Sequence, residues 1–264
     1  MHPKNDAPIY FGQMNWNAIV PTTDIPKEAQ PPRNGVRFLT FTGDEPARWT
    51  AFINDCGADH TFLQLRITDE SKARALSGSG GRGGLGLPGV KAALLPIVKD
   101  SPDMSRVLQV IPEATIFERA IVGRKVASSW LSRGGRAVLL GDAAHGMHPS
   151  IGQGANSALG SAAYLVNSLA SSYATTNLDW LRDGIRQYET SRRCRVDWIH
   201  RFANMMGCGQ ASGSQRLQNI DRSTRTAWSE WVQESGNDDN PPPEEGRDLV
   251  ETFDPLSCPE VSEL

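Results

Sequence analysis

The first half of the chain contains short runs in which apolar and polar residues alternate, a pattern typical of half-buried β-strands. Four such runs lie at residues 9–20, 36–42, 48–54 and 61–68, and another lies at 115–122. Turns rich in glycine, proline, aspartate and asparagine separate the first four. Because the connections are short, the sequence predicts a largely antiparallel sheet.

Apolar residues in the second half recur at helical spacing instead. We expect a helix from 155 to about 173, and a second from near Asn177, a favourable N-cap residue, to beyond Met206. A shorter helix is expected within 88–99. The apolar run 137–140 is predicted to be a short buried strand of a parallel sheet, with Gly141 and Asp142 directly after it. The fold class is therefore α+β with an α/β element.

Composition narrows the choice of function only slightly. The 264 residues carry 27 basic and 30 acidic side chains, so no overall positive charge favours a nucleic-acid partner. The four cysteines are far apart and form no C-x-x-C, which argues against a disulfide framework or a zinc ribbon. A reducing, by default cytoplasmic, location follows. No apolar run approaches the roughly 20 residues of a membrane span.

The last part of the chain differs from the rest in charge. Residues 234–264 contain ten acidic residues and one basic residue, together with a proline run. Such a segment has little apolar surface to bury, so the sequence predicts that it is disordered.

Residues 136–156, RAVLLGDAAHGMHPSIGQGAN, carry the clearest chemistry. Asp142 follows the predicted strand, and its carboxylate can accept hydrogen bonds from sugar-like hydroxyls. Gly152 and Gly154 let the backbone approach a flat ligand closely. The first N–H groups of the helix that follows lack intrahelical partners and carry partial positive charge, which suits an oxyanion.

A second glycine-rich run, SGSGGRGGLGLPG at 77–89, contains a formal G-x-G-x-x-G. A dinucleotide fingerprint needs a buried strand before it and a helix that starts on its last glycines. Here polar residues precede the run and Pro88 interrupts it. We therefore predict a flexible loop.

The 136–156 run resembles the second flavin-binding motif of the FAD-dependent aromatic-ring hydroxylases (group A flavoprotein monooxygenases), a family that also includes carotenoid and squalene epoxidases. Its pattern, strand–GDAAH–x–x–x–P–x–x–G–Q–G–x–N–helix, is matched at every fixed position. The runs IYFGQMNWNAIV at 9–20 and YETSRRCR at 188–195 are similar to flanking family patterns. One departure is Ser161, where the family usually has an aspartate.

The resemblance implies the C-terminal portion of the family fold. Residues 1–125 would form the substrate-domain sheet, 126–232 the C-terminal part of the FAD-binding domain, and 233–264 the acidic tail. The family's opening βαβ unit with its G-x-G-x-x-G, and its second Asp-Gly motif, have no match in this sequence. The expectation is thus an incomplete Rossmann-like sheet, a truncated chain, and weak retention of FAD.

The resemblance also assigns cofactor-binding residues: Gly141, Asp142, Pro149, Gly152, Gln153, Gly154, Ala155 and Asn156. Asp142 would bond the ribityl chain, and Pro149 would lie beside the isoalloxazine ring. The N–H groups of Gly154, Ala155 and Asn156 would face the flavin N1–C2=O edge. No residue is identified as catalytic.

The activity implied is that of an NAD(P)H-dependent monooxygenase. NAD(P)H would reduce FAD, and O2 would form a C4a-hydroperoxide that hydroxylates or epoxidises a small aromatic or isoprenoid substrate. The cofactor carries this chemistry, so the protein needs no catalytic triad.

Two other functions stay open. As a truncated monooxygenase the chain would be inactive alone. The first alternative is a non-catalytic remnant that binds a partner subunit. More remotely, Asp142, His145 and His148 could bind the metal of a hydrolase, although an H-x-x-H in a loop is a weak metal signal. The arginines at 192, 193 and 195 are interpreted as a solvated helix face rather than a pyrophosphate site. Trp16 and Trp49 are expected in the core rather than in a substrate pocket.

Overall fold

The computed structural model describes residues 8–41, 48–68, 83–135, 137–175, 179–212, 222–233, 241–253 and 262–263. The chain divides into two compact units, and each is described by itself below. One comprises Tyr10–Ile121, and the other combines Met1–Ile9 with Val122–Leu264. The glycine-rich run at 77–89 lies outside the described residues up to position 82, as does Asn177.

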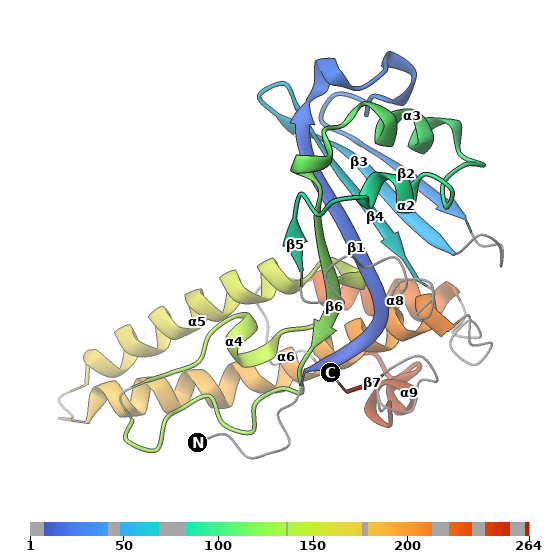
Figure 1. Ribbon diagram of the computed structural model, residues 1–264. Helices are drawn as coiled ribbons and strands as arrows, with labels where there is room; N and C mark the ends of the chain where they lie inside the picture. The colour runs from blue at the N-terminus through green and yellow to red at the C-terminus, as the bar shows by residue number, and fades with distance from the viewer. Residues whose placement is uncertain are drawn as a thin grey trace. The chain divides into compact units, whose positions relative to one another are not determined.

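The Tyr10–Ile121 unit is built on an antiparallel sheet in the order β2-β3-β4-β1-β6-β5, which Figure 1 shows as neighbouring arrows. Its strands are β1 (Ile9–Pro21), β2 (Val36–Phe41), β3 (Trp49–Gly57), β4 (His60–Ile67), β5 (Gly84–Leu85) and β6 (Phe117–Gly123). The alternating runs thus form the predicted strands, and the largely antiparallel sheet is confirmed.

Two short helices share a hydrophobic core with this sheet. They are α2 (Val90–Leu94) and α3 (Pro102–Val110), and three single turns of 3-10 helix accompany them: η1 (Thr22–Asp24), η2 (Lys27–Ala29) and η3 (Glu113–Thr115). Leu94 and Val107 pack in one cluster with Ile53 and Leu65. Trp16 and Trp49 are members of the same buried cluster, so their interpretation as core residues holds.

One of the elements in this region differs from expectation. The helix predicted within 88–99 is shorter, because α2 ends at Leu94 and turns follow it. Residues 107–110 belong to α3, and the sequence explains where this helix starts. The Oγ of Ser101 accepts a hydrogen bond from the Met104 N–H, and Pro102 occupies the first turn.

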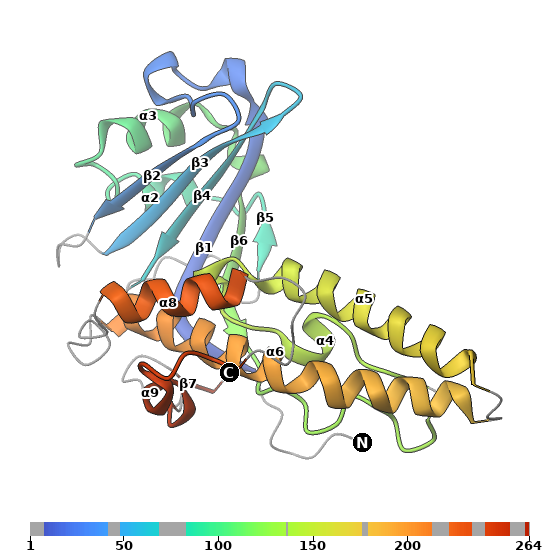
Figure 2. The ribbon, with the colours of Figure 1, turned by 180° about the vertical axis from the view of Figure 1, so that it is seen from behind.

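The other unit is helical. Its elements are α4 (Asp142–His145), η4 (Pro149–Ile151), α5 (Gly154–Tyr173), α6 (Trp180–Ser212), α8 (Arg222–Gln233), α9 (Arg247–Glu251) and the short strand β7 (Ser262–Glu263). Helices α5 and α6 run side by side, as both Figure 1 and Figure 2 show. Both long helices were predicted from the 3.6-residue spacing.

Two clusters of apolar side chains stabilise the helical unit. Helix α6 packs on α8 through Ile199 and Phe202 against Trp228 and Trp231. The other cluster surrounds Trp130 and includes Tyr188 and Val196 of α6. No described helix is both long and apolar enough to cross a membrane.

The strand predicted at 137–140 is not formed among the described residues. Val138 makes only an isolated antiparallel bridge with Leu131, and the Leu139 N–H donates to the Trp130 carbonyl at 2.7 Å. Val138, Leu139 and Leu140 are instead half-buried against the Trp130 cluster, and Ala137 is exposed. A buried strand needs backbone hydrogen bonds to a neighbouring strand on each side. The described chain offers this run only the segment before the tight turn at Gly134–Gly135.

The acidic tail also departs from expectation where it is described. Residues 247–251 form α9, and Val250 is buried in the cluster that contains Trp228. The indole N–H of Trp228 donates to the Glu245 carbonyl at 2.7 Å. A few apolar and backbone contacts therefore hold residues 241–253, which the net charge of the segment does not reveal.

Candidate functional site

The GDAAH segment makes a sharp turn into α4. Gly141 has φ of +58° and ψ of −140°, a conformation that residues with a Cβ rarely adopt. A Cβ there would also lie 3.2 Å from the Cβ of Ala158 in α5. Asp142 is the first residue of α4, and its side chain is exposed. Glycine at this position is therefore what lets the loop lie close to α5 with the carboxylate facing outward.

A second turn leads from Pro149 to α5. Pro149 is exposed and opens η4, and Gly152 ends it in the left-handed conformation, with φ of +67°. The Nδ1 of His148 accepts a hydrogen bond from the Ser150 N–H at 3.0 Å. This pair closes the turn and fixes the point at which α5 begins.

Helix α6 is hydrogen-bonded to this loop. The backbone N–H of His148 donates to the Asn204 side-chain oxygen at 3.0 Å, and the Ser150 hydroxyl donates to the Ala203 carbonyl at 2.6 Å. Sequence reasoning did not single out Asn204, because it lies on a regular helix outside any motif. The available signal in the sequence was a polar residue on the apolar stripe of α6. The structure shows that this residue is buried.

The N-terminus of α5 is open. Its N-cap residue, Gln153, makes no capping hydrogen bond through its side chain. Ala155 and Asn156 are exposed, and a Cβ built on Gly154 would meet no atom within 4 Å. The first N–H groups of a helix have no partners within it. These groups therefore face open space at the positive end of a 20-residue helix.

The eight residues singled out from the sequence thus form two features of one loop. Gly141 and Asp142 make the turn into α4, while Pro149 and Gly152–Asn156 make the turn into α5. One feature offers an acceptor carboxylate, and the other offers backbone donors. Such a pair can bind a ligand that has hydroxyl groups and an electronegative edge.

His145 is buried beneath this loop. Its Nε2 lies 3.2 Å from the Ser161 hydroxyl, and its ring centre lies 5.6 Å from that of Trp130. Burial, with Arg192 nearby as a lesser cause, lowers the pKa of His145 to about 4. The imidazole is therefore neutral at neutral pH and anchors the loop to α5.

The geometry does not favour the metal-site alternative. Asp142 is exposed, whereas His145 and His148 are buried and already hydrogen-bonded, His145 to Ser161 of α5 and His148 to Ser150. Across the described residues, no group of three His, Cys, Asp or Glu side chains is placed to hold a metal ion.

The arginines of α6 are not the solvated face that the sequence suggested. Arg192 and Arg195 are only 6% and 4% exposed, and Arg193 is half-buried. A guanidinium nitrogen of Arg195 donates to the Trp231 carbonyl at 2.7 Å, and the guanidinium carbon lies 4.4 Å from a Trp231 ring centroid. The spacing of 192 and 195 turns both side chains toward α5 and α8, which charge counting does not detect.

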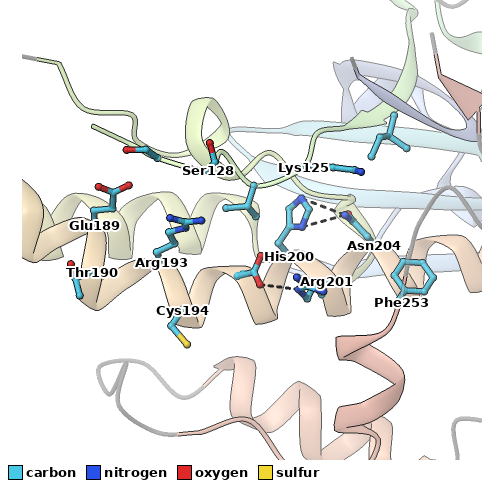
Figure 3. Close-up of a pocket in the computed structure, with 14 residues that line it drawn as sticks. Lys125, Ser128, Glu189, Thr190, Arg193, Cys194, His200, Arg201, Asn204 and Phe253 are labelled. Carbon is cyan, nitrogen blue, oxygen red and sulfur yellow. Dashed lines mark hydrogen bonds and ion pairs between the residues drawn. The ribbon is translucent and has the colours of Figure 1, made fainter. Parts of the chain in front are cut away.

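A cavity of the helical unit lies elsewhere, along α6 (Figure 3). It measures about 1040 Å³, and Lys125, Glu189, Arg193, His200 and Asn204 are among its lining residues. Its charges are partly paired, since Arg201 donates to Asp197 at 2.8 Å. None of the eight loop residues lines it. The sequence motif and this cavity therefore mark different places in this unit.

A separate polar pair is buried in the sheet unit. The Arg66 Nε donates to the Asn15 side-chain oxygen at 3.0 Å, and the Trp16 indole donates to Glu118 at 3.0 Å. Burial lowers the pKa of Arg66 to about 10, with a smaller contribution from Arg119. These residues lie on strands whose alternation predicted only structure, so sequence reasoning missed them.

Comparison with known proteins finds a family model and relatives that match the part of the chain containing the motif. The model of an FAD binding domain matches residues 104–203. Zeaxanthin epoxidase of Nicotiana plumbaginifolia is 36% identical over 123 residues, which are 44% of this chain and 18% of the relative. The FAD-dependent monooxygenase janM of Penicillium janthinellum is 43% identical over 77 residues, or 27% of this chain and 16% of the relative.

A solved structure agrees on the fold. HpxO of Klebsiella pneumoniae, complexed with FAD and uric acid, matches with a TM-score of 0.58 at 21% identity, covering 93% of this chain and 52% of that one. The chain thus spans under a fifth of those two curated relatives and about half of that structure. These matches show that the chain resembles the FAD-dependent aromatic-ring hydroxylases, over the C-terminal portion of their fold.

Proposed function

We propose that the chain binds the flavin of FAD at the loop 141–156 and serves an FAD-dependent monooxygenase reaction. The reductant would be NAD(P)H, and the substrate a small aromatic or isoprenoid molecule that is hydroxylated or epoxidised with O2. The matched FAD binding domain supports the cofactor. Relatives named for zeaxanthin and for uric acid support the substrate class.

The observation that carries the proposal is that one loop holds both the open N-terminus of α5 and the exposed carboxylate of Asp142. The N–H groups of Gly154, Ala155 and Asn156 suit the N1–C2=O edge of the isoalloxazine, which becomes more negative on reduction. Asp142 suits the ribityl hydroxyls as an acceptor. Gly141 and Gly152 keep Cβ atoms away from both places. The residues present therefore fit the cofactor.

FAD, when bound, supplies the electron transfer and the activation of O2. The protein's part is to bind, orient and shield. Pro149 is exposed, and its ring, which carries no N–H, would lie beside the flavin. His145 stays neutral beneath the loop, so it adds no positive charge that would compete with the α5 N-terminus.

The experiment is anaerobic reduction of the protein loaded with FAD. The proposal predicts that NADH or NADPH bleaches the visible absorbance of the bound flavin, and that air restores it with consumption of O2. Protein that binds FAD but is not reduced by either nucleotide would contradict the monooxygenase assignment. Protein to which FAD does not bind would contradict the cofactor assignment as well.

One observation favours the alternative, a non-catalytic module that binds a partner subunit. Leu159, Val166 and Tyr173 are 70%, 63% and 70% exposed, and their spacing of seven places them along one side of α5. A module of this kind would remain colourless, and Leu159→Lys with Val166→Lys would abolish its association with the partner. The same two substitutions would leave reduction of a bound flavin intact if the stripe serves only association.

A further inference from the structure

Strand β2 lies at one edge of the antiparallel sheet. It pairs with β3 on one side, and no strand of the described chain pairs with it on the other. Figure 2 shows it as the outermost arrow of the sheet, beside β3. The backbone groups of an edge strand point alternately toward its neighbour and toward the open side. The open side of β2 is therefore a potential site for a further strand.

The hydrogen bonds to β3 identify which residues face this open side. The Asp55 N–H donates to the Gly35 carbonyl at 3.0 Å, directly before β2 begins. In an antiparallel pair such bonds recur at every second residue, so the odd-numbered residues of β2 bond to β3. The N–H and C=O groups of Val36, Phe38 and Thr40 therefore point away from β3. Among the described residues, none donates to or accepts from these groups.

The side chains of the same three residues lie on the open face of the sheet. Ile53 of β3 packs in the core on the opposite face, and Leu39 of β2 packs partly against that core. Val36 and Phe38 are 50% and 56% exposed, and Thr40 is exposed as well. An open backbone edge beside exposed apolar side chains is what an added β-strand requires.

The edge lacks the features that usually prevent such pairing. Natural edge strands are commonly protected by an exposed charge, a proline or a bulge. The one charged residue of β2, Arg37, is directed elsewhere, because its guanidinium pairs with Asp103 of α3 and donates to the Glu28 carbonyl. Strand β2 contains no proline, and its register with β3 is regular along its whole length.

We propose that β2 pairs with β2 of a second copy of this chain, antiparallel, about a two-fold axis at Phe38. In this register Phe38 exchanges two backbone hydrogen bonds with Phe38 of the second copy, and Val36 exchanges two with Thr40 of that copy. Every outward backbone group of both strands is then paired. Arg37 comes opposite Leu39 of the second copy, so no like charges face each other. The inference goes beyond flavin binding and does not depend on it.

The arrangement of the edge also defines the kind of partner. Regularly spaced N–H and C=O groups match the edge of another strand, whereas the backbone groups of a helix are bonded within the helix. A second copy of β2 carries the same groups at the same spacing. The same surface is then used on both chains, so the contact closes after two copies.

The test is sedimentation equilibrium of the full chain, without added flavin, over a wide range of protein concentration. We expect a reversible equilibrium between monomer and dimer. A monomer at every concentration would overturn the second copy as the occupant and leave an unrelated extended segment in its place. Assembly beyond the dimer would overturn the closed two-fold contact.

Charge substitutions at Phe38 test the register. Phe38→Lys and Phe38→Glu each place like charges opposite each other across the two-fold axis and remove the contact between the rings. Each variant alone should raise the dimer dissociation constant by roughly 5-fold or more. An equimolar mixture should recover dimers that contain one lysine and one glutamate chain. A lysine variant that dimerises like the wild type, or a mixture that recovers nothing, would overturn this register.

Two further variants separate backbone pairing from surface charge. Thr40→Pro removes an N–H that points outward, so it should weaken the dimer while the circular dichroism spectrum and the ladder to β3 stay intact. A folded Thr40→Pro chain that dimerises like the wild type would contradict backbone pairing. Val36→Lys decides the question if the proline variant does not fold. Its matched control is Val110→Lys, since Val110 is 45% exposed and ends α3, at the opposite end from Asp103. Equal dimerisation of the two lysine variants would overturn the proposal.

Discussion

The buried residues of the loop 141–156 determine its shape more than its exposed residues do. Asp142 and Pro149 could be selected from the sequence because their spacing matches a known motif. The burial of His145 and His148 could not be predicted. A loop has no periodic pattern that tells buried positions from exposed ones. The contacts of His148 with Gly207 and Asn204 join positions more than 50 residues apart, which no local pattern encodes.

His145 should make stability depend on pH. Its pKa is about 4 in the folded chain and near 6.5 when unfolded, so the unfolded state binds the proton first as the pH falls. Stability is therefore complete above pH 6.5 and declines toward pH 4, by roughly 2–3 kcal/mol from this group. Denaturant titrations between pH 7 and pH 4.5 should show a smaller decline for His145→Gln. An unchanged decline would refute the assignment.

Gly207 should be required for the packing of the His148 ring against α6. A Cβ at Gly207 would lie 2.3 Å from the Cγ of the His148 ring, too close for either residue to remain in place. We expect Gly207→Ala to lower the free energy of unfolding by about 1–3 kcal/mol despite the better helix propensity of alanine. The control is Gly134→Ala, where a Cβ meets no atom within 4 Å. A Gly207→Ala chain as stable as the wild type in urea titration would contradict this packing.

At the scale of elements, periodicity predicted the long strands and the two long helices well. It was wrong for residues 137–140, where Val138, Leu139 and Leu140 pack on Trp130 instead of forming a strand. Short apolar runs are ambiguous because the pattern indicates burial but not the type of secondary structure. The start of α5 was predicted at Ala155 and lies at Gly154, but the absence of a side-chain cap became visible only in the structure.

The open end of α5 can be tested with one added charge. Ala155→Asp places a carboxylate in the first turn, where it should stabilise the helix by about 0.3–1 kcal/mol. The same charge should weaken binding of FAD, because it opposes the electronegative edge of the flavin. Ala170→Asp, in the last turn, should lower stability slightly and leave FAD binding unchanged. Melting curves and flavin titrations measure both effects, and equal effects of the two variants on FAD binding would refute the role of this terminus.

At the scale of the whole molecule, the two units have separate cores. Among the described residues, the cluster around Ile53 and Leu65 contains only residues from 10–120, while the clusters around Trp130 and Trp228 contain only residues from 126–253. The family resemblance implied a change of architecture at 125/126. The acidic tail was harder to predict, since α9 depends on contacts with α8 that lie far away in sequence.

Separate cores imply separate responses to core mutations. Leu65 is fully buried in the sheet unit, so Leu65→Ala should destabilise that unit by about 2–5 kcal/mol. Hydrogen exchange followed by mass spectrometry should show faster exchange in β1, β3 and β4, with α5 and α6 protected as in the wild type. Equal acceleration in the long helices would show that the two units unfold as one.

The most direct test of the account is equilibrium titration of the chain with FAD, followed by flavin fluorescence, for the wild type and Asp142→Ala. The account predicts weak but saturable binding by the wild type. In the variant, loss of the acceptor carboxylate should weaken binding by roughly 10-fold or more, with the melting temperature little changed because the side chain is exposed. Absence of saturable binding, or equal affinity in the two proteins, would contradict the assignment of the loop 141–156 as a flavin site.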